Sequence, residues 1–149
     1  MPQSLSKVIM HIVFSTKGRK AFISAELETE LYKIINSVCT ENNSYCYSVG
    51  GMSDHIHIAC ELPQTLSISD LVKTIKISTS LWFSETKNLH DFSWQSGYGV
   101  FSVSQSHLNG LIDYIDQQAK HHQRINFQDE FRKLLKRHQV EFNETYVWD

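Results

Sequence analysis

This sequence has few cysteines, no long apolar run and no excess of positive charge. The three cysteines, Cys39, Cys46 and Cys60, form no CxxC pair, and their odd number fits reduced thiols better than a disulfide framework. The sequence contains no apolar run of about 18 residues. Its first residues, MPQSLSKVIMHIVF, lack the charged start, long apolar stretch and cleavage site of a signal peptide. We therefore expect a cytoplasmic protein that does not interact with membranes.

The formal charge of -2 and the isoelectric point near 6.4 argue against a protein that coats nucleic acid, because neutralising phosphates requires clustered Lys and Arg. Local clusters are nevertheless present. They lie at Lys17, Arg19 and Lys20, at Lys73 and Lys76, and at Lys120, His121, His122 and Arg124. Each cluster is a candidate anion-binding surface, and an ordinary solvated helix face explains any one of them about equally well.

The hydrophobic content and the length predict one folded domain over residues 1–149. Hydrophobic residues make up 41% of the chain and aromatic residues 11%, which is enough to build a core without disulfide bonds. We find no internal repeat, low-complexity tract or linker that would divide the chain.

Hydrophobic periodicity predicts four strands and four helices. Strands are expected at residues 7–14, 44–49, 55–62 and 97–104, with a turn through Gly50, Gly51, Ser53 and Asp54 joining the second strand to the third. Helices are expected after Ser24, after Ser67 or Ser69 as far as Phe83, from Ser106 to Gln123, and at 127–139 behind Asn126. This order predicts an α+β, ferredoxin-like βαββαβ fold with an antiparallel sheet, helices on both faces and a C-terminal helical extension.

The stretch SDHIHIACEL places two histidines on one face of an otherwise apolar strand. Because strand side chains alternate, His55 and His57 point to one side of the sheet and Ile56 and Ile58 to the other. Two imidazoles about 6 to 7 Å apart can bind one cation between them. The pair alone is weak evidence for a metal site, because two unrelated histidines give the same pattern and such sites usually need a third ligand.

The segment LIDYIDQQAKHHQ offers that third ligand. At about 100° per residue, Tyr114, Gln118 and His121 fall on one narrow stripe of a helix, and His122 flanks it. A half-buried tyrosine on an amphipathic helix is the simpler explanation of this segment alone. Gln117, His121 and His122 remain alternative ligands, although surface or phosphate contacts are the more ordinary role of the two histidines.

Together these motifs resemble the single-tyrosine HUH transposases of the 200/605 type of bacterial insertion sequences. The resemblance rests on HIVFSTKGRK, SDHIHIACELP, WQSGYGVFSVS and YIDQQAKHH, in this order along the chain. It implies that His55, His57 and Gln118 bind a divalent metal ion, Mg2+ or Mn2+, and that Tyr114 is the catalytic nucleophile.

The resemblance also implies what the protein acts on. Its substrate would be single-stranded DNA with hairpins at the element ends, cleaved and rejoined through a 5'-phosphotyrosine by a homodimer with composite active sites. Under this reading the basic clusters become candidate DNA contacts. Two alternatives share the same residues: a replication initiator or relaxase, and a domesticated relative that binds hairpin DNA or RNA without mobility.

Overall fold

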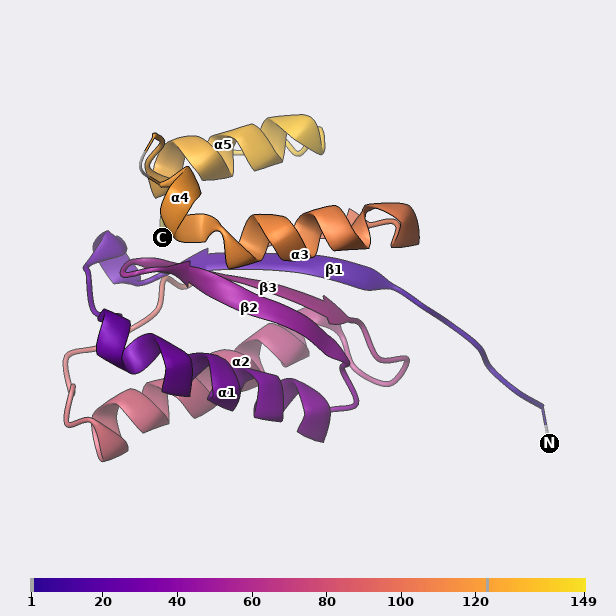
Figure 1. Ribbon diagram of the computed structural model, residues 1–149, viewed down its shortest axis with the longest axis horizontal. Coiled ribbons are helices and arrows are strands. Elements are labelled where there is room, and N and C mark those ends of the chain that lie inside the picture. Colours follow the sequence, from indigo (N-terminus) through magenta and orange to yellow (C-terminus); the bar gives the residue numbers. More distant parts are fainter. Residues whose placement is uncertain (1, 123) are drawn as a thin grey trace.

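A computed structural model describes residues 2–122 and 124–149. Its centre is one antiparallel sheet in the order β2-β3-β1-β4, built from β1 (Ile9–Ser15), β2 (Cys46–Met52), β3 (His55–Glu61) and β4 (Gly99–Val103). This order and the element sequence confirm the predicted α+β, ferredoxin-like fold (Figure 1). Among the described residues, no helix is both long and apolar enough to span a bilayer.

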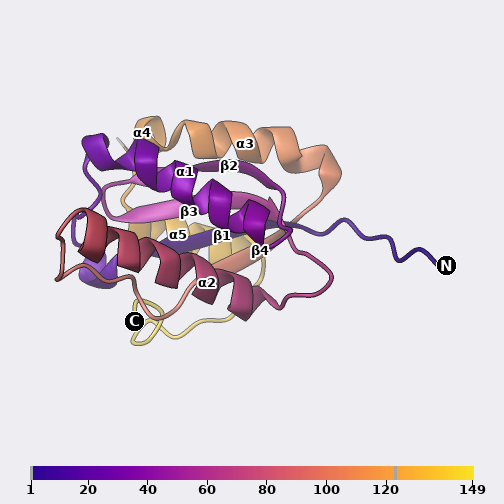
Figure 2. The ribbon, with the colours of Figure 1, turned by 90° about the horizontal axis from the view of Figure 1, so that it is seen from below.

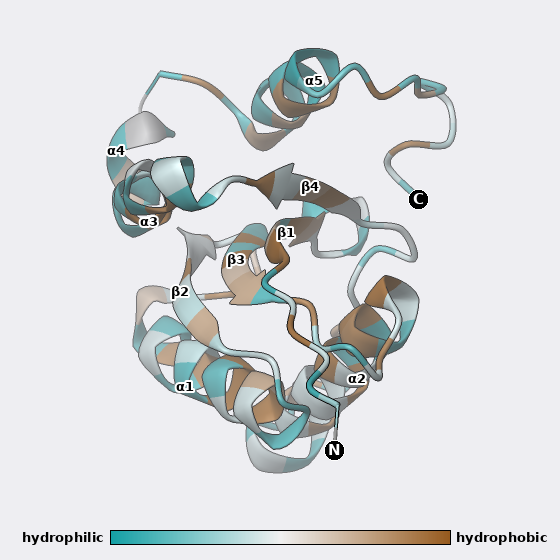
Figure 3. Cartoon of the chain, turned by 90° about the vertical axis from the view of Figure 1, so that its right-hand side faces the viewer, coloured by the Kyte–Doolittle hydropathy of each residue, from teal (hydrophilic) through white to brown (hydrophobic). Residues whose placement is uncertain are grey.

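Helices cover both faces of the sheet, as predicted. The helices α1 (Ala25–Glu41) and α2 (Ile68–Leu81) lie side by side on one face (Figure 2). The opposite face carries α3 (Leu108–Asp116), α4 (Gln118–His121) and α5 (Phe127–Arg137) (Figure 3). The sheet is therefore the middle layer of three, and side-chain alternation divides its residues between two interiors.

The larger core lies between the sheet and α1 and α2. Strand residues Met10, Ile12, Phe14, Ile56 and Ile58 point into it, and all five are at most 2% exposed. A smaller apolar cluster on the other face joins Val13 and Phe101 of the sheet to four residues of α5, namely Phe127, Phe131, Leu134 and Leu135. This second cluster attaches α5 to the face that carries His55 and His57.

The predicted strands are all present, but the hairpin turn is shorter than expected. Gly50 and Gly51 were expected in the turn, whereas β2 continues through both to Met52, and only Ser53 and Asp54 form the turn. Gly50 pairs with His57 in the β2–β3 ladder. The expectation was wrong because glycine usually marks turns, while here Gly50 lies where a helix approaches the strand closely.

The predicted helix caps are largely correct, and one helix is not continuous. Ser67 accepts a hydrogen bond from the Asp70 backbone N–H, and Asn126 accepts one from that of Asp129, as expected of N-caps. The helix expected from Ser106 to Gln123 begins at Leu108 and is interrupted at Gln117, whose φ of -106° and ψ of 24° separate α3 from α4. Gln123 lies outside the described residues.

Candidate active site

The two histidines of β3 lie on the sheet face covered by α3, α4 and α5. His57 is paired with Val13 of β1 and His55 with Ser15, and their strand, β3, lies between β2 and β1 in the sheet. Both side chains are 0% exposed. Buried imidazoles require hydrogen-bond partners, and every ring nitrogen of this pair has one.

The Nδ1 atoms of both histidines, called the outer nitrogens here, are held by hydrogen-bond partners on the side away from Glu130. His55 Nδ1 hydrogen-bonds Asp54 Oδ1 at 2.7 Å, and His57 Nδ1 lies 2.7 Å from Nε2 of His11 on β1. The His11 and His57 rings also stack, with centroids 5.0 Å apart. Burial lowers the pKa of His57 despite the opposing hydrogen bond to Glu130. A metal-binding histidine needs a neutral imidazole with its other nitrogen held by a partner.

Gln118 lies in the same cluster, and Gln117 does not. The Gln118 side chain is 2% exposed, and its Oε1 accepts a hydrogen bond from His55 Nε2 at 3.0 Å. Gln117, at the interruption between α3 and α4, is exposed. The structure thus brings His55, His57 and Gln118 together, as the sequence predicted.

Tyr114 of α3 lies beside this cluster in the same chain. Its ring centroid is 5.7 Å from that of His57 and 6.1 Å from that of His11. Its hydroxyl donates a hydrogen bond to Glu130 Oε2. Burial raises the pKa of Tyr114, and the neighbouring carboxylate raises it further, so the phenol is protonated at neutral pH.

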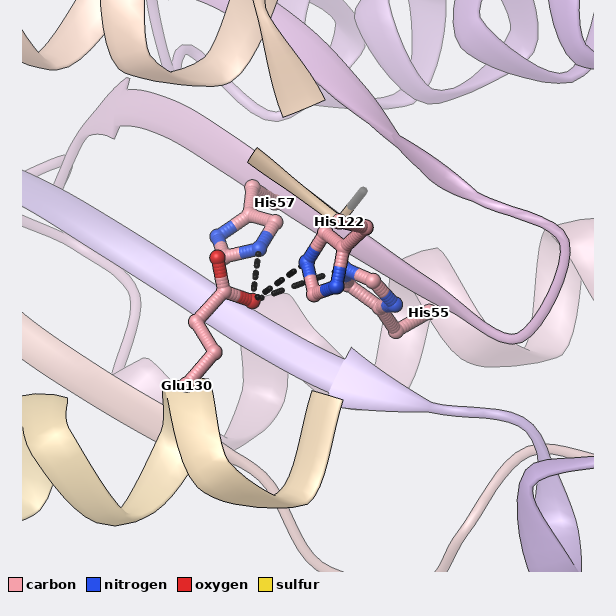
Figure 4. Close-up of side chains that lie close together, drawn as sticks. All are labelled: His55, His57, His122 and Glu130. Atoms are coloured by element: carbon pink, nitrogen blue, oxygen red, sulfur yellow. Dashed lines mark hydrogen bonds and ion pairs between the residues drawn. The ribbon is translucent and has the colours of Figure 1, made fainter. Parts of the chain in front are cut away.

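Glu130 of α5 is the centre of the hydrogen-bond network. Its Oε1 lies 3.0 Å from His57 Nε2, 3.1 Å from His122 Nε2 and 3.5 Å from His55 Nε2 (Figure 4). The side chain is 4% exposed. Burial raises the pKa of this carboxyl, but the hydrogen bonds from His122 and His57 outweigh it and hold the pKa far below its ordinary value.

The donors at this site fit a divalent cation. One ring nitrogen from each of His55, His57 and His122 and one oxygen of Glu130 lie within 4.8 Å of one another. The amide oxygen of Gln118 is adjacent to His55. Imidazole nitrogens combined with amide and carboxylate oxygens are ligands that Mn2+ and related cations accept.

An open pocket of about 680 Å³ leads to Tyr114. Tyr114, His11 and Glu130 line this pocket together with Lys133 and Arg137 of α5. Anionic ligands are attracted to such a lining. The nucleophile candidate therefore lines an open pocket that also contains two basic side chains of α5.

The basic clusters fall in different places. Lys17, Arg19 and Lys20 lie in and next to the short turn after β1, where Thr16 N–H hydrogen-bonds the carbonyl of Asp54. Lys120 and Arg124 line a groove of about 730 Å³ together with basic residues of α5.

The remaining candidates for DNA contact are less favourably placed. Lys73 and Lys76 lie on α2, across the sheet from Tyr114, and the Lys76 ammonium donates to three backbone carbonyls of residues 95–97. For His122 a surface or phosphate-contacting role was expected, with metal binding as the alternative; its side chain is 7% exposed and contacts Glu130. The side chain of His121 lies outside the described residues.

Sequence reasoning missed three residues of the network: Asp54, His11 and Glu130. Asp54 was assigned only to a turn, and His11 only to an apolar strand. Glu130 shares the buried helical stripe of Phe127 and Phe131, and an acidic residue in such a stripe is the signal that could have revealed it.

Comparison with known proteins places this chain in a family. Residues 4–118 match the family model described as "Transposase IS200 like". The transposases for insertion sequence element IS200 of Salmonella typhimurium and Salmonella typhi are each 28% identical to the chain over 116 residues, which cover 74% of this chain and 76% of theirs.

Two solved structures share the fold. A putative transposase from Deinococcus radiodurans has a TM-score of 0.62 at 21% identity, covering 79% of this chain and 98% of its own. A REP-associated tyrosine transposase bound to a REP hairpin has a TM-score of 0.61 at 15% identity, covering 84% and 74%. With more than half of its length matched by the family model, the chain belongs to the IS200-like transposases, a family of DNA-processing enzymes.

Proposed function

We propose that this protein cleaves and rejoins single-stranded DNA at insertion-sequence ends through a covalent 5'-phosphotyrosine on Tyr114. The observation that supports this most is the convergence of Tyr114 and Gln118 on His55 and His57, about sixty residues away in the sequence. The Tyr114 and His57 rings are 5.7 Å apart, and Gln118 Oε1 is 3.0 Å from His55 Nε2. A nucleophile beside a cation site is the arrangement that phosphoryl transfer requires.

His55, His57 and Gln118 would hold the Mg2+ or Mn2+ ion. Two imidazoles and an amide oxygen suit Mn2+ somewhat better, because Mg2+ prefers oxygen ligands. When bound, the cation supplies electrostatic stabilisation of the phosphate charge in the transition state. Asp54 and His11 keep the two imidazole rings oriented toward it.

Tyr114 performs the covalent step. Its hydroxyl oxygen attacks the scissile phosphorus and loses its proton, a P–O bond to tyrosine forms, and the bond to the 3' oxygen breaks, leaving a free 3'-hydroxyl. The phosphotyrosine bond conserves the energy of the phosphodiester bond that was broken. Attack by another 3'-hydroxyl then releases Tyr114 and joins two strands without ATP, so the reaction is transesterification.

We also propose that the substrate carries hairpins and that a homodimer with composite sites acts on it. Hairpin binding is supported by the structural neighbour bound to a REP hairpin. The groove lined by Lys120, Arg124, Lys133 and Lys136 offers contacts to the phosphate backbone. A dimer would hold two DNA ends at once.

Labelled single strands from the flanks of the gene test the proposal directly. We expect a denaturant-resistant protein–DNA adduct that requires Mn2+ or Mg2+, forms on single-stranded but not duplex DNA, and is absent in Tyr114→Phe. Tyr146→Phe, at a tyrosine that is 68% exposed, is the control and should retain the adduct. Undiminished adduct in Tyr114→Phe would place the nucleophile elsewhere, and hairpin binding without adduct would favour the domesticated alternative.

A further inference from the structure

Glu130 is the buried charged residue at this site that the resemblance leaves without a role. It lies on α5, which begins at Phe127, whereas the family match ends at residue 118. Glu130 therefore lies outside the matched residues. Its contacts with the site come from this chain's own C-terminal helix.

The position of Glu130 on α5 calls for an explanation. Phe127, Phe131 and Leu134 occupy the same face and pack in the apolar cluster against Val13. An apolar side chain at position 130 would continue this face. Burying a carboxylate instead is unfavourable unless the charge is paired and hydrogen-bonded, so helix packing alone does not account for this residue.

The two carboxylate oxygens face different partners. Oε1 faces the imidazole nitrogens, at 3.0 Å from His57 Nε2 and 3.5 Å from His55 Nε2. Oε2 accepts hydrogen bonds from the Tyr114 hydroxyl and from Gln118 Nε2. One side chain thus contacts the nitrogen atoms of the proposed cation site on one side and the proposed nucleophile on the other.

A carboxylate oxygen also improves the donor set. Two imidazole nitrogens and one amide oxygen carry no negative charge, whereas Mn2+ and Mg2+ favour carboxylate oxygens. Glu130 Oε1 is within 4.8 Å of all three imidazole donors, so one cation can reach it together with the histidines.

We propose that Glu130 is a further ligand of the divalent cation and a positioning residue for the Tyr114 hydroxyl, so that one side chain couples the cation to the nucleophile. This inference rests on the proposed function for the role of Tyr114. Its ligand part can be measured without DNA. The competing explanation is that Glu130 only forms ion pairs with the histidines and stabilises the fold.

Mn2+ binding to the DNA-free protein, measured by calorimetry and by electron paramagnetic resonance of free Mn2+, tests the ligand role. We expect Glu130→Gln, which keeps the shape but removes the charge, to weaken Mn2+ binding by at least about tenfold. Glu141→Gln, at an exposed position beyond α5, is the control and should bind like the wild type. A folded Glu130→Gln protein with wild-type Mn2+ affinity would overturn the proposal.

The positioning role is tested by adduct formation at saturating Mn2+. Glu130→Gln retains an oxygen that can accept the Tyr114 hydrogen bond, whereas Glu130→Ala does not. We expect saturating Mn2+ to restore most of the adduct rate that Glu130→Gln loses at limiting Mn2+, and to leave the rate of Glu130→Ala low. Equal recovery in both variants would remove the positioning part.

A measurement on the wild type covers the case in which neither variant folds. In crystals soaked with Mn2+, the anomalous peak should lie within about 2.5 Å of a Glu130 oxygen. A peak at the histidines but away from Glu130 would overturn the ligand role. If Glu130→Gln weakens Mn2+ binding but no strand gives a tyrosine adduct, the ligand role stands and the proposed function fails.

Discussion

At the scale of single residues, the histidine pair has the support that a metal site requires. Asp54 holds the outer nitrogen of His55, and His11 holds that of His57. Such outer partners fix the ring orientation of metal-binding histidines. The inner nitrogens converge on Glu130 Oε1, which accounts for two fully buried imidazoles in a strand that could have been entirely apolar.

The two adjacent glutamines give the first residue-level prediction. Gln118→Ala removes an amide that is 2% exposed and hydrogen-bonded to His55, whereas Gln117→Ala changes an exposed side chain. We expect Gln118→Ala to reduce adduct formation by roughly tenfold or more, and Gln117→Ala to have little effect. Adduct rates at limiting Mn2+ measure this, and the reverse order would mean that Gln117 is the ligand.

Acid sensitivity is the second residue-level prediction. Although burial opposes it, hydrogen bonds from His122 and His57 hold the pKa of Glu130 far below the ordinary value of 4.5. A carboxyl whose pKa is lower in the folded chain than in the unfolded chain stabilises the fold. Below about pH 4.5 the unfolded chain takes up a proton at Glu130 that the folded chain does not, so this stabilisation is lost as the pH falls. The contribution is complete above that pH.

Comparing the wild type with Glu130→Gln isolates the contribution of Glu130 to the pH dependence of stability. Between about pH 5.5 and about pH 3.5, the unfolding free energy of the wild type should fall by about 1 kcal/mol more than that of Glu130→Gln. Urea unfolding at the two pH values measures it. Parallel losses in the two proteins would show that Glu130 carries no such linkage.

Motif residues could be predicted from the sequence, and their supporting partners could not. The alternation of β3 and the helical spacing of Tyr114 and Gln118 depend only on local geometry. His11 and Glu130 meet His57 through contacts 46 and 73 residues apart in the sequence. Such pairings follow from the register of β1 with β3 and from the return of α5 over the sheet, which local patterns do not specify.

At the scale of elements, the interruption at Gln117 is the main departure from expectation. Apolar periodicity continues through this region, so it predicted one helix. Hydrogen bonds from the Gln117 N–H to the carbonyl of Asp113 and from the Lys120 N–H to that of Gln117 show one helix ending where the next begins. Gln118 and His122, which are four residues apart and therefore lie on the same side of the chain, both reach the cluster beyond the interruption.

Close packing of α3 on β2 yields the element-level prediction. A Cβ atom at Gly50 would lie 2.5 Å from the carbonyl oxygen of Ile115, which is too close. Gly50→Ala should therefore push α3 outward and move Tyr114 away from His57. We expect a roughly ten- to hundredfold loss of adduct formation, because small misplacements of reacting groups have effects of this size.

Gly110→Ala is the matched control on α3 itself. Apart from its chain neighbours and the backbone of its own helix, no described residue has an atom within 4 Å of a Cβ at Gly110, and alanine favours a helix over glycine by about 1 kcal/mol. This variant should leave α3 in place on β2 and be equally or more stable in thermal unfolding. Full activity in Gly50→Ala would show that the β2–α3 contact does not position Tyr114.

At the scale of the whole molecule, the sheet separates the main apolar core from the polar cluster of the candidate site. The face toward α1 and α2 holds the larger core, and the opposite face holds the polar cluster. Among the basic residues, Lys76 of α2 is bound to backbone carbonyls, whereas Lys133 of α5 lines both the pocket that contains Tyr114 and the groove that contains Lys120. We therefore expect DNA contacts from α4 and α5 rather than from α2, despite the net charge of -2.

Dimer organisation is the last prediction. In the single chain, Tyr114 lies beside its own His57, whereas the proposed dimer exchanges tyrosine helices between subunits. Exchange requires α3 to leave its strands, and α3 has only two buried residues, Leu108 and Ile115, within the described part of the chain. Leu111, Ile112 and Tyr114 are half-buried in addition, so detachment exposes apolar surface that an identical surface on a second subunit would have to cover.

A mixed dimer of His57→Ala and Tyr114→Phe subunits distinguishes the two arrangements. With composite sites, one site collects both defects, and the other combines an intact histidine pair with an intact tyrosine. We expect adduct formation at about half of the wild-type level in a purified, non-exchanging mixed dimer. If each chain instead completes its own site, as the single chain is arranged, both sites keep one defect and mixing two inactive variants restores nothing. Circular dichroism of each variant before mixing ensures that a missing signal reflects site composition rather than unfolding.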